Sequence, residues 1–139
     1  DQQSVPSLKH LTSVALNALA SFEEPFLLLL ETEELDSSGH WRNEKRLLRG
    51  LDAMQDTVTV VFDFLERHPD TLFVFTSDHE TGGLILKSDW TDRRVKPVFQ
   101  SFGHTGSVVP VMAVGPADTE FIGFHTNDGL GRLLKSLIN

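Results

Sequence analysis

The sequence contains no cysteine among its 139 residues. This absence excludes disulfides, iron–sulfur clusters, cysteine-based zinc fingers and a cysteine nucleophile, although it leaves the redox compartment open. Basic residues are also scarce, because 12 Lys and Arg stand against 20 Asp and Glu and give a formal net charge of −8. Such a chain is a poor candidate for a dedicated nucleic-acid partner, since phosphate contacts need Lys and Arg. It is a better candidate for binding cations.

Long hydrophobic runs are absent as well. The longest uninterrupted apolar run, residues 26–30, is far shorter than the roughly 20 residues that cross a bilayer, so no membrane span is expected. The chain begins at Asp1 without an initiator Met and without the basic and apolar segments of a signal peptide. We interpret this beginning as that of a processed chain or an excised fragment.

The order of the predicted elements is typical of an α/β fold with a mostly parallel sheet. Apolar residues recur at helical spacing, or follow a capping residue, in three stretches: 8–22, 44–67 and 127–137. Apolar and β-branched runs predict strands at four places: 26–30, 71–76, 84–86 and 108–114. The first of these runs is also compatible with a helix. Residues 85–103 are expected to form a surface excursion.

Carboxylates and histidines follow two of the predicted strands at their carboxyl ends. Glu31, Asp36 and His40 follow the first strand, and Asp78 and His79 follow the second. Ligands bind outside the carboxyl ends of strands in open α/β sheets, so two parallel neighbours would bring both segments to one edge. Carboxylates mixed with imidazoles suit zinc, and an additional carboxylate suits magnesium.

The first of these segments is strongly acidic. Residues 31–36 hold four carboxylates and no basic residue. Packed at a sheet edge, these carboxylates would repel one another unless a cation lay between them. A solvated acidic loop is the alternative interpretation for this segment alone. The pair Asp78 and His79 at the matching position of the next strand makes a metal site the preferred one.

Another histidine, His104, lies between two glycines just before the last predicted strand. Flanking glycines allow the backbone to approach another group closely. His104 precedes its strand, whereas the other candidates follow theirs, so either that strand runs antiparallel or the loop reaches across. The remaining histidines are expected to have no direct metal role: His10, His68 and His125.

These segments resemble the alkaline phosphatase family. Residues 31–40 are similar to its E-x4-D-x3-H segment, residues 76–83 to its [TS]-[AS]-D-H-E-T-G-G segment, and residues 104–106 to its H-T-G segment. The resemblance covers nearly the whole chain. It implies an α/β three-layer sandwich with a mostly parallel central sheet, of which residues 1–139 would form the C-terminal part of a single domain, so that the N-terminal half of the same protein would be missing.

The resemblance implies a zinc-dependent phosphoric monoester hydrolase that holds two zinc ions and one magnesium ion. It also implies a phosphate monoester substrate and a periplasmic or extracellular location, and it allows a homodimer. The implied ligands are divided as follows: Asp36, His40 and His104 for the first zinc ion, Asp78 and His79 for the second, and Glu31 for magnesium.

The sequence departs from the family at the nucleophile. In the family a serine in an Asp-Ser-Ala-type segment attacks phosphorus in line, and the phosphoseryl intermediate is then hydrolysed. No such segment occurs here, and Ser37 is not a substitute, because it merely follows the expected ligand Asp36. The isolated chain is therefore expected to be inactive. Other hydrolases of the superfamily, such as phosphodiesterases, and a metal-binding fragment without catalytic activity stay open as alternatives.

Overall fold

The computed structural model describes residues 5–22, 24–89, 91 and 93–138. Four α-helices, six strands and one 3₁₀ helix follow one another along these residues: α1 (Leu8–Ala20), α2 (Glu34–His40), α3 (Glu44–Arg67), β1 (Phe73–Thr76), β2 (Glu80–Thr81), β3 (Leu84–Asp89), β4 (Arg94–Phe99), β5 (His104–Thr105), β6 (Val111–Val114), η1 (Asp118–Phe121) and α4 (Asn127–Ile138).

Local signals account for the two longest helices. Helix α1 begins after Ser7, whose hydroxyl accepts a hydrogen bond from the His10 N–H at 3.2 Å. Helix α3 begins after Asn43, whose side chain accepts from the Arg46 N–H at 2.9 Å. Both are N-cap bonds that satisfy a backbone donor left free at a helix start. The predicted helix over 44–67 is confirmed, and the first helix ends at Ala20, two residues before the predicted end.

The core lies where α1 packs on α3. Leu16, Val61 and Phe64 form its buried cluster, against which Leu28 and Phe73 pack. Burying an apolar side chain of this size contributes about 1.5–3 kcal/mol. The cluster therefore anchors both the extended segment before α2 and strand β1 on the helical layer.

The strands pair antiparallel in three two-stranded sheets: β1 with β6, β2 with β5, and β3 with β4. In the first sheet, Phe73 lies opposite Val114 and Thr76 lies opposite Val111. The carboxyl end of β1 therefore meets the amino end of β6. The sequence left open whether the strand after His104 runs antiparallel or whether its loop reaches across. The register shows that this strand, β6, runs antiparallel to β1.

One expectation about the sheet differs from the structure, and another is not confirmed by it. The segment 26–30 is extended, but it forms no strand pair within the described residues, and Leu27 and Leu29 are exposed. An apolar run specifies burial, whereas a strand also needs a partner for its backbone groups. None of the pairings within the described residues is parallel, so the mostly parallel central sheet stays a prediction.

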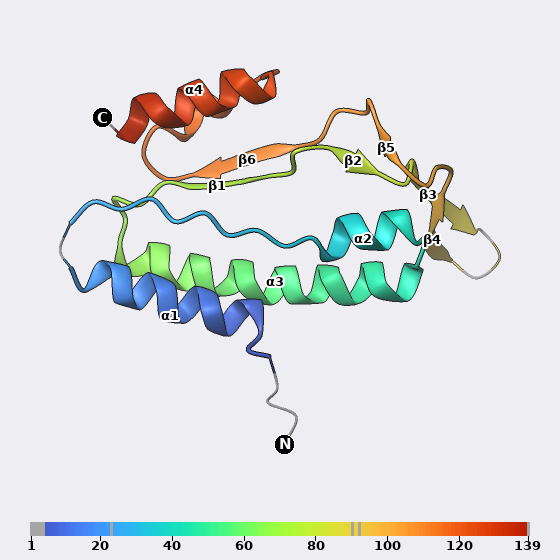
Figure 1. The fold of residues 1–139 in the computed structure, drawn as a ribbon, viewed down its shortest axis with the longest axis horizontal. Helices are drawn as coiled ribbons and strands as arrows, with labels where there is room; N and C mark the ends of the chain where they lie inside the picture. Colours follow the sequence, from blue (N-terminus) through green and yellow to red (C-terminus); the bar gives the residue numbers. More distant parts are fainter. Residues whose placement is uncertain (1–4, 23, 90, 92, 139) are drawn as a thin grey trace.

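Helices lie on both sides of the β1–β6 pair. Figure 1 shows α1 and α3 on one side of this pair and α4 on the other, with the extended segment before α2 running along the pair. The β3–β4 hairpin lies at the end of the molecule near α2. Within the described residues, no helix combines the length and the apolar character that crossing a membrane requires.

Candidate metal centre

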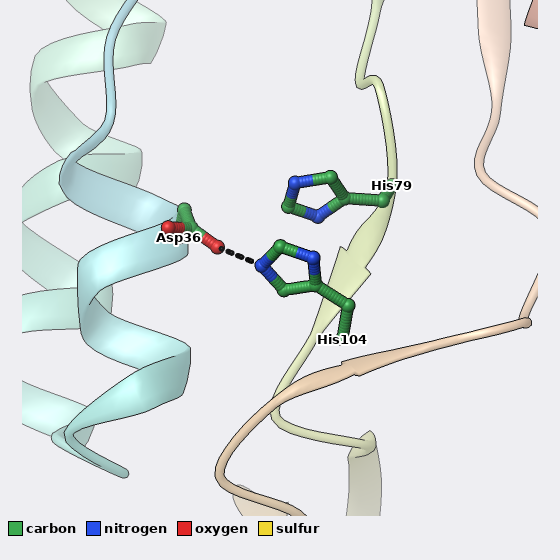
Figure 2. Close-up of side chains that lie close together, drawn as sticks. All are labelled: Asp36, His79 and His104. Carbon is green, nitrogen blue, oxygen red and sulfur yellow. Dashed lines mark ion pairs between the residues drawn. The ribbon is translucent and has the colours of Figure 1, made fainter.

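The candidate ligands come from one helix and two strand segments. Asp36 and His40 lie four residues apart on the short helix α2, a spacing that places both on one helix face. His79 lies just before β2, and His104 lies in β5, which pairs with β2. Figure 2 shows Asp36 and the rings of His79 and His104 close together between α2 and these strands.

Three ligand atoms form a compact triangle, which we call the donor triangle: Asp36 Oδ1, His40 Nε2 and His104 Nε2. The two imidazole nitrogens are 3.2 Å apart, and each lies 3.5 Å from Asp36 Oδ1. Metal–ligand bonds of about 2.0–2.1 Å in a tetrahedron place neighbouring ligand atoms about 3.3 Å apart. The donor triangle therefore has the size of one face of a tetrahedral zinc site.

The ring of His40 has a fixed orientation. Its Nδ1 lies 2.6 Å from the carbonyl oxygen of Phe102. A carbonyl oxygen can only accept, so Nδ1 carries the proton and donates it. In the neutral ring Nε2 then keeps its lone pair and points into the donor triangle. Metal-binding histidines commonly have this arrangement, in which the second nitrogen is held by a hydrogen bond.

Asp78 and His79 form a second group of ligand atoms beside the donor triangle. His79 Nε2 lies 3.2 Å from Asp78 Oδ2, and the His79 ring stacks on His104 with 3.6 Å between ring centroids. Ligand atoms of Asp36, His79 and His104 all lie within 4.8 Å of one another. The two groups therefore adjoin, as they would around a pair of ions about 3.5–4 Å apart.

The charge of Asp36 suits a metal ligand. The hydrogen bond from the Thr81 hydroxyl and, to a lesser degree, the charges of the neighbouring histidines lower the pKa of Asp36, although desolvation opposes them. The carboxylate therefore stays ionised near neutral pH and offers an anionic oxygen to a cation.

Glu80 holds the two histidine-bearing segments together. Its carboxylate accepts hydrogen bonds from the Thr105 hydroxyl and from the N–H groups of Gly83, at 3.2 Å, and Leu84, at 2.9 Å. Burial raises the pKa of Glu80, but these hydrogen bonds outweigh it and leave the pKa below its usual value. The ionised side chain thus joins the loop after His79 to the strand that carries His104. Glu80 is not among the residues that the sequence motifs predicted as ligands.

Close backbone contact brings α2 to β2. A Cβ atom on Gly39 would lie 2.8 Å from the Thr81 carbonyl oxygen, closer than such atoms approach in proteins. Gly82, at φ 90°, is equally crowded, because a Cβ there would lie 2.8 Å from the Phe99 ring. Glycine at both positions allows α2 to approach near enough for Asp36 to reach the histidines.

The acidic run is only in part a cation site. Glu34 pairs with Arg46 through two hydrogen bonds of 2.8 and 3.0 Å, and this pairing lowers the pKa of Glu34. The interpretation of all four carboxylates as a group awaiting cations is therefore wrong for Glu34, because a guanidinium on α3 already neutralises it. Glu31 is exposed on the extended segment, and the structure does not bring it into the Asp36–His79–His104 group.

A centre built from histidine and carboxylate, without cysteine, is typical of metal sites that take part in hydrolysis. Residues 1–96 match the family model described as alkaline phosphatase. The chain therefore belongs to the alkaline phosphatase family.

Curated relatives agree with this membership. A repressible alkaline phosphatase of Saccharomyces cerevisiae is 38% identical over 98 residues, which cover 66% of this chain and 17% of that protein. An alkaline phosphatase of Escherichia coli is 23% identical over 152 residues, which cover 97% of this chain and 32% of that protein. The chain thus spans a third or less of the length of these relatives.

Solved structures agree as well. A mutant of TAB5 alkaline phosphatase with Mg bound matches 95% of this chain and 42% of its own chain, with a TM-score of 0.84 and 30% identity. A cold-active alkaline phosphatase of Shewanella sp. matches all of this chain and 52% of its own, with a TM-score of 0.86 and 22% identity, which bears on the fold alone. Both matches support an alkaline phosphatase-like α/β fold.

Proposed function

We propose that the chain is the metal-binding portion of a zinc-dependent phosphoric monoester hydrolase. The observation that carries this proposal is the donor triangle of Asp36, His40 and His104, whose edges of 3.2–3.5 Å suit one tetrahedral ion. Membership of the alkaline phosphatase family supports phosphatase-type hydrolysis as the chemistry of the complete protein.

The proposed ligand sets follow the two groups of side chains. The donor triangle would hold the first zinc ion, Asp78 and His79 would contribute to the second, and Glu31 would bind magnesium. When bound, the ions supply electrophilic stabilisation of the negative charge on the attacking and leaving oxygens of phosphoryl transfer.

The chain's own residues prepare these ligands. The Phe102 carbonyl holds the His40 ring so that, in the neutral ring, the lone pair of Nε2 points into the donor triangle, and Glu80 joins the segments that carry His79 and His104. Because these positions are set before an ion arrives, little reorganisation is needed when the site fills.

The attacking serine is a separate matter. Ser77, beside the centre, donates its hydroxyl to the His79 carbonyl at 2.7 Å. Ser38 is fully buried and donates to the Leu35 carbonyl at 2.6 Å. Both hydroxyls are thus bonded to backbone carbonyls of their own segments. Because residues 1–139 also contain no Asp-Ser-Ala-type segment, we propose that the nucleophile of the complete enzyme comes from a segment other than these 139 residues.

The same proposal covers the surroundings of the enzyme. Its substrate would be a phosphate monoester, and it would act in the periplasm or outside the cell. A homodimer is compatible with this function. These statements rest on the family, because the chain spans only part of its relatives.

Reconstitution tests the proposal. The 139-residue chain is treated with a chelator, loaded with zinc and freed of excess metal; zinc is measured by elemental analysis and hydrolysis of p-nitrophenyl phosphate is followed by absorbance. We expect bound zinc with little or no hydrolysis. A chain that retains no zinc would refute the metal centre. Robust zinc-dependent hydrolysis would instead show that the chain contains its own nucleophile.

A further inference from the structure

The hydroxyl of Thr81 lies between the two groups of ligands. Thr81 Oγ1 is 2.5 Å from Asp36 Oδ1 and 3.2 Å from His79 Nδ1. Asp36 belongs to the donor triangle, and His79 belongs to the adjoining group. One side chain that is not itself a candidate ligand therefore touches a ligand of each group.

The number of protons at this hydroxyl determines the direction of both hydrogen bonds. The ionised carboxylate of Asp36 can only accept, so the Thr81 hydroxyl uses its single hydrogen to donate a hydrogen bond to it. The hydroxyl oxygen must then accept from His79, and the proton of the neutral His79 ring must lie on Nδ1. His79 Nε2 consequently carries a lone pair.

That lone pair faces another acceptor. His79 Nε2 lies 3.2 Å from Asp78 Oδ2. Two lone pairs at this distance repel each other unless a cation lies between them, so in the metal-free chain the hydrogen bond to Thr81 must outweigh this repulsion for the Nδ1–H form to persist. The hydrogen bond to Thr81 therefore holds His79 in the tautomer that leaves Nε2 and the Asp78 carboxylate directed at a shared positive charge.

We propose that Thr81 is a positioning residue that couples the two metal sites by fixing the carboxylate of Asp36 and the Nδ1–H tautomer of His79 through one hydroxyl. The inference rests on the proposed metal function and goes beyond it, because it assigns a role to a side chain that binds no metal. Hydrogen-bond partners of metal ligands typically change metal affinity about 10–100-fold when they are removed.

A packing role for Thr81 can be separated from this one. The Thr81 methyl group lies close to Gly39, where a Cβ would be 2.9 Å from Thr81 Cγ2. Thr81→Val keeps a methyl group at this position and removes the hydroxyl, whereas Thr81→Ser keeps the hydroxyl and removes the methyl group. The matched control is Thr59→Val on the exposed part of α3, where the Thr59 hydroxyl donates to the Gln55 carbonyl.

The first experiment needs no metal. Two-bond ¹⁵N–¹H correlation spectra of the metal-free chain, recorded where the imidazoles are neutral, report the tautomer of His79. We expect the Nδ1–H form in the unsubstituted chain and in Thr81→Ser, and loss of that preference in Thr81→Val. An Nε2–H form in the unsubstituted chain, or no change in Thr81→Val, would overturn the proposal.

The second experiment measures zinc affinity by competition with a chromophoric chelator. We expect Thr81→Val to weaken binding about 10–100-fold, while Thr81→Ser and Thr59→Val stay close to the unsubstituted chain. Equal losses in Thr81→Ser and Thr81→Val would indicate packing and refute the role of the hydroxyl. If the unsubstituted chain binds no zinc, the proposed function fails, but the tautomer spectra still decide whether Thr81 fixes His79.

Discussion

The Nε2 atoms of His40 and His104 lie 3.2 Å apart, although 64 residues separate the two histidines in the sequence. The contact depends on the end of α2, where His40 donates to the Phe102 carbonyl and Arg42 donates to the Ser101 carbonyl at 3.1 Å. The Arg42 guanidinium also lies 3.6 Å from the centre of the Phe102 ring. These contacts fasten the loop before His104 to the helix that carries His40.

Replacing either of these histidines should therefore weaken zinc binding strongly. We expect His40→Ala and His104→Ala each to lower zinc affinity by more than the 10–100-fold that loss of a supporting hydrogen bond typically causes, because each removes a ligand atom itself. Chelator competition on the 139-residue chain measures this.

His68 provides the control for that measurement. Its ring stacks on Phe64 with 4.1 Å between centroids, in the helical core and not among the grouped ligands. His68→Ala should change the midpoint of thermal unfolding without changing zinc affinity. Similar losses of affinity in all three variants would contradict the assignment of His40 and His104 as ligands.

Local patterns predicted the helices well and the strand pairing poorly. The helix over 44–67 follows from its own apolar stripe and from the cap at Asn43, and both signals depend only on residues that are close together in the sequence. The partner of a strand is a distant segment, so the run at 26–30 could not show whether its backbone would be paired. Helix α2 was missed, because its acidic residues resembled a loop.

The candidate site was likewise predicted only in part from the sequence. The motifs identified Asp36, His40, Asp78, His79 and His104 as candidates, and the structure brings these five side chains together. Which of them share an ion stays a prediction.

The motifs predicted the metal ligands but not the residues that hold those ligands in place. The role of Thr81 depends on α2 approaching β2, which no sequence pattern reveals. One signal was available, because residues two apart along an extended segment point to the same face, as His79 and Thr81 do.

Gly39 offers a test of the contact between α2 and β2. Gly39→Ala would place a Cβ 2.8 Å from the Thr81 carbonyl oxygen, so the helix must move away from the strand. We expect a loss of about 1–3 kcal/mol in the free energy of unfolding, as for other overpacked sites. Zinc affinity should fall as well, because Asp36 and His40 move with the helix. Urea unfolding and chelator competition measure the two effects.

Gly131 supplies the matched substitution. It lies within α4, and a Cβ there would meet nothing within 4 Å. Gly131→Ala should raise the free energy of unfolding by about 0.5–1 kcal/mol, because alanine loses less conformational entropy in a helix. Retention of full stability and full zinc affinity by Gly39→Ala would show that α2 and β2 are not in close contact.

Thr12 is a buried polar residue whose replacement should stabilise the chain. Its side chain is fully buried in α1, and its Oγ1 has no hydrogen-bond partner within the part of the chain that the structure describes. A buried hydroxyl without a partner costs about 1–3 kcal/mol, and valine has nearly the same shape. We expect Thr12→Val to increase the free energy of unfolding by up to that amount, measured by urea denaturation.

Thr57 is the comparison for that change. It is buried on α3, but its hydroxyl donates to the Ala53 carbonyl at 2.8 Å. Thr57→Val should therefore give no gain in stability. Equal gains from both substitutions would mean that valine is favoured for another reason, and the explanation through an unpaired hydroxyl would fail.

Asp128 at the beginning of α4 should make the stability of the chain depend on pH. Hydrogen bonds from Thr126 and then from Arg132, whose Nη1 lies 2.6 Å from Asp128 Oδ2, lower the pKa of Asp128. The pKa is thus lower in the folded chain than in the unfolded chain. Ionised Asp128 therefore stabilises the fold above the unfolded pKa, and this contribution is lost as pH falls through the folded pKa.

Asp128→Asn should lower the urea midpoint slightly at pH 7, since the pair is exposed. The difference should begin to shrink as the pH falls below about 4, the usual pKa of aspartate, and should disappear once the pH lies below the lowered pKa of the folded chain. It should also shrink at pH 7 in an Arg132→Met background. A difference that is constant over this pH range would mean that Asp128 acts without its charge.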